Sequence, residues 1–136
     1  MKQKHKAEHD RLRVLIDGYL DLLREEVPPD INEIMKRRLA FSNAGLAHLA
    51  SQGPVFAALR TGDPAHPADR VVDQHEARVR EIMPGYSALV QNWTPARIVA
   101  EWPAYCREVQ GMVKRYHAFI SWEEAAVLPL LDRATV

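Results

Sequence analysis

One glutamate lies where the surrounding sequence predicts an apolar surface. If residues 116–131, YHAFISWEEAAVLPLL, form a helix that turns about 100° per residue, one face is mostly apolar, with Tyr116, Phe119, Ile120, Ala126, Val127, Leu130 and Leu131. Glu123 falls near the middle of this face, and Glu124 falls toward its edge. A carboxylate buried without a partner is strongly destabilising, so we expect cationic or hydrogen-bonding partners at Glu123.

Three histidines occupy comparable positions on other predicted helices, each on an otherwise apolar face. Side chains that point inward from different helices of a bundle can converge on one layer of its core. Imidazole nitrogens and carboxylate oxygens are ligands for iron, manganese and zinc. The predicted metal ligands, one from each helix, are therefore His9, His48, His75 and Glu123.

Each of these residues also has a simpler explanation. A single buried histidine is more often a hydrogen-bonded core residue than a metal ligand, and a histidine–glutamate pair can form a buried salt bridge. Four such residues, one on each predicted helix, favour a shared metal site over four separate coincidences. The residues alone leave open the alternative of a metal-free core in which histidines neutralise Glu123.

The elements that must position these residues are helices throughout. Helical segments are predicted over about residues 7–26, 31–60, 68–93 and 95–132, with Asp30 and Thr94 as N-caps. We expect Pro54 to kink or interrupt the second segment, and Pro84 to kink the third. Short connections between four helices favour an all-α fold, an antiparallel up-down four-helix bundle that forms a single domain over residues 1–136.

Composition narrows the classes of function. The 136 residues are 47% hydrophobic and 26% charged, which is typical of a soluble globular domain. Eighteen basic and eighteen acidic residues give no net charge, so we expect no nucleic-acid partner, and no apolar run is long enough for a membrane span. The basic start, MKQKHK, is expected to fray and has no following apolar stretch typical of a signal peptide. Cys106 is the only cysteine, and a reducing cytoplasm is the expected location.

Four segments of the sequence carry a family resemblance: EHDRLRVLIDGYLDLL, HLASQGPVFAAL, QHEARVREI and HAFISWEEAAVLPLL. Together they extend over nearly the whole chain, and they resemble the hemerythrin-like (HHE cation-binding) family. The resemblance implies a four-helix bundle that holds a non-haem di-iron centre. It further implies one of three functions: binding dioxygen, sensing oxygen, nitric oxide or redox state, or handling iron. Some members of the family also have a peroxidase-like or catalase-like side activity.

The family pattern matches this sequence only in part. The family ligand positions that match are His9, His48, His75 and Glu123. Three further ligand positions hold Gln52, Val79 and Phe119, of which only the glutamine can bind a metal, and weakly. The resemblance therefore implies that one iron keeps two histidines and one carboxylate, the ligand set of mononuclear non-haem iron sites. Three states of the site remain open. It binds one metal, it is a variant di-iron site with replacement ligands, or it is a metal-free remnant.

Several other residues are candidates for additional or supporting roles. Gln52 is a candidate amide ligand, and His117 would reach the site only through a local π-bulge or kink and otherwise lies beside Glu124. Tyr19 and Tyr86 either hydrogen-bond a ligand or belong to the aromatic core, and the second role is favoured. His5, one turn before the first predicted ligand, either approaches the open end of the bundle or belongs to a mobile terminus, and the second is expected.

Two hypotheses for function follow. In the first, the bundle binds iron and interacts with oxygen, nitric oxide or peroxide as a sensor, a carrier or an iron-handling protein. Dedicated catalysis is not expected, because the sequence defines no substrate pocket. In the second, the ligand set has degenerated, and the metal-free bundle acts as a structural or regulatory interaction module. A homodimer is compatible with both hypotheses.

Overall fold

The computed structural model describes residues 2–134, with side chains described as far as Leu131, and these residues form helices and connections without a strand. Met1, Thr135 and Val136, which fall within the predicted domain, lie outside the described residues. The long helices are α1 (Lys2–Leu22), α2 (Ile31–Leu59), α3 (Pro67–Asn92) and α5 (Trp102–Ala126), and the short ones are α4 (Pro95–Ala100) and α6 (Leu128–Ala134).

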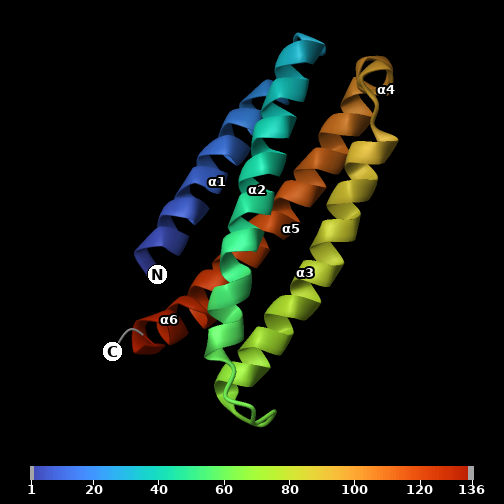
Figure 1. Cartoon of the computed structure of the whole chain (residues 1–136). Coiled ribbons are helices and arrows are strands. Elements are labelled where there is room, and N and C mark those ends of the chain that lie inside the picture. The colour runs from blue at the N-terminus through green and yellow to red at the C-terminus, as the bar shows by residue number, and fades with distance from the viewer. Residues whose placement is uncertain (1, 135–136) are drawn as a thin grey trace.

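The long helices lie side by side, and each runs back along the one before it (Figure 1). Helix α1 packs against α2 and α5, and α3 packs against the same two helices. Every long helix therefore has two long neighbours, and side chains from all of them can meet in the interior. Short helix α6 leaves the end of α5 and contacts both α1 and α2.

The start of α2 and of α4 follows from side-chain capping. The Asp30 carboxylate accepts a hydrogen bond from the Asn32 amide at 2.9 Å, and the Thr94 hydroxyl accepts one from the Arg97 amide at 3.3 Å. Both predicted N-caps are therefore confirmed. Helix α2 is not interrupted at Pro54. Gln52 and Phe56, on either side of this proline, are buried in the core, and their packing supports the helix through it.

The segment predicted as one fourth helix is three helices, which corrects the prediction. Proline has no backbone N–H, and its ring clashes with the preceding turn, so the first turn of a helix is where it is tolerated best. Pro103 is accordingly the second residue of α5, and Pro129 is the second residue of α6. Helix α4 ends before Glu101, whose backbone angles are not helical, and α5 ends before Val127.

The beginning of α1 also differs from its prediction. The helix starts at Lys2, not near residue 7, and ends at Leu22, not near residue 26. His5 is buried, with 3% of its surface exposed, and its ring lies edge-on to the ring of His48 at 5.8 Å between centroids. The expectation that His5 belongs to a mobile terminus is therefore wrong, because contact with α2 holds this turn of α1 in the interior.

Three apolar clusters fill the interior. The largest includes Trp93, Trp102 and Tyr105 near the α3–α4–α5 end. A second cluster contains Phe56, Val72, Val127, Leu128 and Leu131, and a third contains Leu12, Phe119 and Ile120. Glu123 follows Ile120 and precedes Val127 on the inward face of α5, so a polar layer lies between the second and third clusters.

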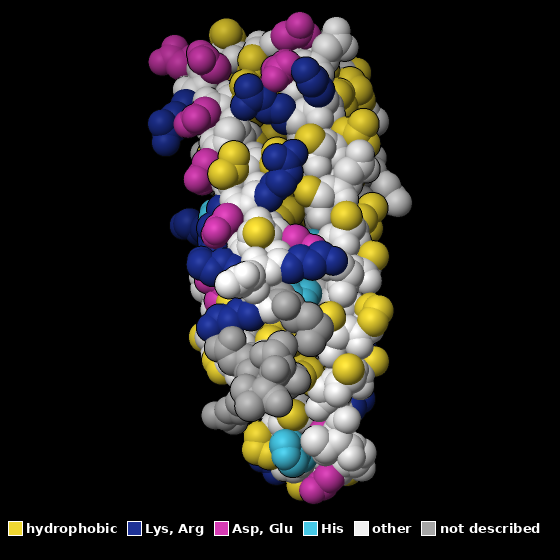
Figure 2. Space-filling model, turned by 60° about the vertical axis from the view of Figure 1, so that its left-hand side comes forward, with side chains coloured by type: hydrophobic (Ala, Val, Ile, Leu, Met, Phe, Trp, Pro, Cys, Tyr) yellow, Lys and Arg dark blue, Asp and Glu magenta, His cyan; other side chains and the backbone are white. Residues whose placement is uncertain are grey.

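Outside the core, basic and acidic side chains are interspersed over the upper and left-hand parts of the face shown in Figure 2. This distribution agrees with the equal numbers of the two charge types in the sequence. Among the described residues, no helix combines the length and the apolar character that crossing a bilayer requires.

Candidate metal centre

All four residues predicted as ligands are buried. His9 comes from α1, His48 from α2, His75 from α3 and Glu123 from α5, and none of them has more than 5% of its surface exposed. The apolar periodicity of each helix thus placed the predicted ligand of that helix correctly in the interior.

Glu123 is the centre of the arrangement. Its Oε2 lies 3.1 Å from His9 Nε2 and 3.9 Å from His48 Nε2. Its Oε1 lies 3.3 Å from His75 Nε2 and accepts a hydrogen bond from the Gln52 amide. Burial alone would raise the pKa of the Glu123 carboxyl, but the three surrounding imidazoles outweigh burial and hold this pKa well below its usual range. Glu123 is therefore an ionised carboxylate in an apolar core.

His9 lies between two carboxylates. Its Nε2 faces Glu123, and its Nδ1 lies 3.1 Å from Oε1 of Glu124, which also accepts a 2.6 Å bond from Arg13. A neutral imidazole has one N–H, so a neutral His9 would direct a lone pair at one of the two carboxylates. A positive charge is therefore needed here, either from a second proton on the His9 ring or from a metal ion bound to it. A carboxylate such as Glu124 on the outer nitrogen is the usual support of a metal-binding histidine.

His48 has the same kind of outer support. Its Nδ1 contacts the Glu8 carboxylate, and its Nε2 lies 2.7 Å from the Gln52 amide nitrogen. An amide nitrogen only donates hydrogen bonds, so Nε2 accepts and the ring proton lies on Nδ1, directed at Glu8. The lone pair of Nε2 consequently faces the interior, in the tautomer that binds a metal.

Two buried atoms of this layer have no hydrogen-bond partner in the described structure: Gln52 Oε1 and His75 Nε2. The 3.3 Å contact between His75 and Glu123 does not have hydrogen-bonding geometry. Leaving a buried polar atom unpaired costs about 1–3 kcal/mol. Both atoms are potential metal ligands, and His9, His48 and Glu123 each offer a ligand atom within 4.8 Å of the other two. The donor set therefore fits a bound cation.

The other predicted residues lie around or away from this layer. Val79 and Phe119, which the hemerythrin-like resemblance aligned with ligand positions, pack in the third apolar cluster beside the site. The hydroxyl of Tyr19 hydrogen-bonds that of Tyr105, and Tyr86 hydrogen-bonds Ser42, so neither phenol is bonded to the candidate ligands. His117 is half-buried on α5 and is not a member of either potential cation group found among the described residues.

Sequence reasoning missed Glu8. Its carboxylate bonds His48 and also accepts a 3.0 Å hydrogen bond from Ser51. The signal in the sequence was the spacing of His5 and Glu8, three residues apart and so on one helical face. That spacing alone does not reveal that this face of α1 meets α2.

Comparison with known proteins identified no related protein. No family model matches the chain, and no curated protein or solved structure matches it. The chemistry of the site is therefore argued from its own contacts.

The donor role of Gln52 gives a prediction for the protein stripped of metal. Gln52→Met keeps the shape of the side chain but removes the amide that bonds Glu123. We expect the free energy of unfolding in urea to fall by roughly 2 kcal/mol, since hydrogen bonds to charged groups contribute about that much. The control is Gln91→Met, at an exposed glutamine of α3, which should change little. Equal stability of both variants would contradict the assigned hydrogen bond.

Proposed function

We propose that the chain is a hemerythrin-like metal-binding protein, an antiparallel up-down four-helix bundle that holds one non-haem iron. The proposed ligands are His9 Nε2, His48 Nε2 and the Glu123 carboxylate, with His75 beside the other oxygen of that carboxylate. The observation that carries the proposal is the convergence of three imidazole Nε2 atoms, from three helices, on one buried carboxylate. Two histidines and one carboxylate leave coordination positions open, as in mononuclear non-haem iron sites.

A single iron suits this chain better than two. A second ion at the family position would need ligands where Val79 and Phe119 lie in an apolar cluster. Gln52 is neutral, so it cannot neutralise the charge between two cations as a carboxylate does. When bound, the iron would supply redox chemistry and a coordination position for a small molecule. The protein would supply the dry environment and, through Glu124 and Glu8, the orientation of His9 and His48.

A pocket gives a small molecule a route to this layer. It has a volume of about 390 Å³ and lies between α2 and α3. Gln52 and His75 line it together with apolar side chains, and Arg60 and Arg80 belong to its lining. The pocket suits oxygen, nitric oxide or peroxide, which supports a role in sensing, carrying a diatomic ligand or handling iron.

A second candidate function is a metal-free structural or regulatory module. The observation in its favour is that protons can replace the metal: Gln52 already donates to Glu123, and a doubly protonated His9 would donate to both Glu123 and Glu124. Exposed apolar residues on α2, Leu39 and Leu46, lie seven positions apart on one helical face. They would suit a protein partner or a homodimer.

Replacing Glu123 with leucine separates the two candidates. In the metal-binding protein, adding iron(II) without oxygen at 100-fold above its Kd should stabilise the metal-stripped wild type by about 2.7 kcal/mol, seen as a rise in Tm. Glu123→Leu should abolish this rise, whereas Glu81→Leu, at an exposed position on α3, should keep it. In the metal-free module, iron should change neither Tm, and Glu123→Leu should lower stability, because the Gln52 amide and the His9 ring lose their buried acceptor.

Access through the pocket is tested by filling it. Ala57 lines the pocket and is exposed, so Ala57→Trp places an indole in the proposed route without entering the core. We expect nitric oxide to bind the iron-loaded variant several-fold more slowly in stopped-flow absorption, with iron content unchanged. Ala58→Trp, also exposed but outside the lining, is the control and should react like the wild type. Unchanged rates in both variants would show that small ligands enter elsewhere.

A further inference from the structure

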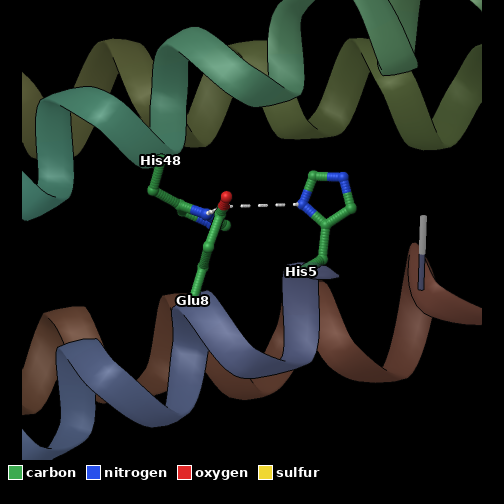
Figure 3. Close-up of side chains that lie close together, drawn as sticks. All are labelled: His5, Glu8 and His48. Carbon is green, nitrogen blue, oxygen red and sulfur yellow. Dashed lines mark hydrogen bonds and ion pairs between the residues drawn. The ribbon is translucent and has the colours of Figure 1, made fainter. Parts of the chain in front are cut away.

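A second group of potential metal ligands lies on the other side of His48. It consists of His5 and Glu8 on α1 and His48 on α2, and each residue offers one ligand atom within 4.8 Å of the others. His5 and Glu8 lie one turn apart on the same face of α1, and both side chains extend from α1 toward the His48 side chain (Figure 3). Neither His5 nor Glu8 matches a ligand position of the hemerythrin pattern quoted above.

His5 is the residue that needs an explanation. Its side chain is 4% exposed, and its Nδ1 is buried without a hydrogen-bond partner. The nearest acidic atom, Glu8 Oε2, is 3.9 Å from this nitrogen, which is too far for a hydrogen bond but leaves room for a bridging ion. A metal coordinated by both atoms would pair the nitrogen that is unpaired in the protein alone.

The two ligand groups use different atoms of His48. Its Nε2 faces Glu123 and Gln52, whereas its Nδ1 contacts Glu8. The Ser51 hydroxyl, with one proton to donate, lies 3.2 and 3.0 Å from the two oxygens of Glu8 and 2.9 Å from the His48 carbonyl, so it is within bonding distance of the carboxylate from the α2 side. One quarter of the Glu8 side chain is exposed, which gives an ion a path from solvent.

We propose that His5 Nδ1, the Glu8 carboxylate and His48 Nδ1 form a second site for a divalent transition-metal ion of the zinc class. Two imidazole nitrogens and one carboxylate, with a fourth position left for water, are a ligand set that zinc accepts. The site goes beyond the proposed iron centre and shares only His48 with it. When both ions are bound, His48 bridges them and its remaining ring proton is released to solvent.

The test is a zinc titration of untagged, metal-stripped protein, followed by equilibrium dialysis and elemental analysis. The wild type should bind two zinc ions per chain. His5→Phe keeps an aromatic ring against His48 but has no lone pair, and it should bind one. His9→Phe, which alters only the first site, should also bind one. His117→Phe, at a half-buried histidine outside both groups, is the control and should bind two.

Glu8→Gln provides a variant that is safer for folding, because Glu8 is partly exposed and glutamine can still accept the His48 proton. It should weaken binding at one of the two zinc sites by about tenfold or more, since even supporting residues of metal sites change affinity by that factor. Circular dichroism confirms that each variant remains helical.

The outcomes separate this inference from the proposed function. If His5→Phe and Glu8→Gln bind zinc as the wild type does, the second site is wrong. If the wild type binds a single zinc that His9→Phe loses and His5→Phe keeps, the second site is also wrong and the first stands. If His5→Phe loses that single zinc and His9→Phe keeps it, the second site stands and the first fails. Absence of zinc binding overturns the second site and leaves the first to the iron(II) test.

Discussion

The structure depends on keeping one carboxylate ionised inside an apolar core. Glu123 is 1% exposed and lies between two hydrophobic clusters, where an uncompensated charge would be strongly destabilising. The three other long helices each contribute one imidazole to it, and α2 also contributes the Gln52 amide. Two of these imidazoles are held from outside by a second carboxylate, Glu124 for His9 and Glu8 for His48. Carboxylates and imidazoles therefore alternate from the centre of the layer toward solvent.

Neutralising Glu123 does not by itself explain so many partners. One protonated histidine and one amide would balance the charge and fill the nearest hydrogen-bonding positions. The chain instead brings three imidazole Nε2 atoms to the carboxylate, and it leaves His75 Nε2 and Gln52 Oε1 without hydrogen bonds. The surplus of ligand atoms, and the outer carboxylates on His9 and His48, are the features on which the proposed metal site rests.

Much of this arrangement was predictable from the sequence, because helical periodicity is a local property. It placed His9, His48, His75 and Glu123 in the interior, and Asp30 and Thr94 at helix starts. The division of the last predicted helix depended on two prolines whose effect could have been read as a kink or as a new start. The burial of His5 and the role of Glu8 were not predictable, since both depend on which face of α1 meets α2.

The most direct measurement is the metal content of the purified protein. Untagged chain, produced with iron and zinc available and purified without chelator, would be quantified by elemental analysis and then reconstituted with each metal. The account predicts iron or zinc in stoichiometric amount in a helical, folded chain. A folded chain that contains no metal and takes up none on reconstitution would contradict it, and Glu123 would then be the counter-ion of protonated histidines.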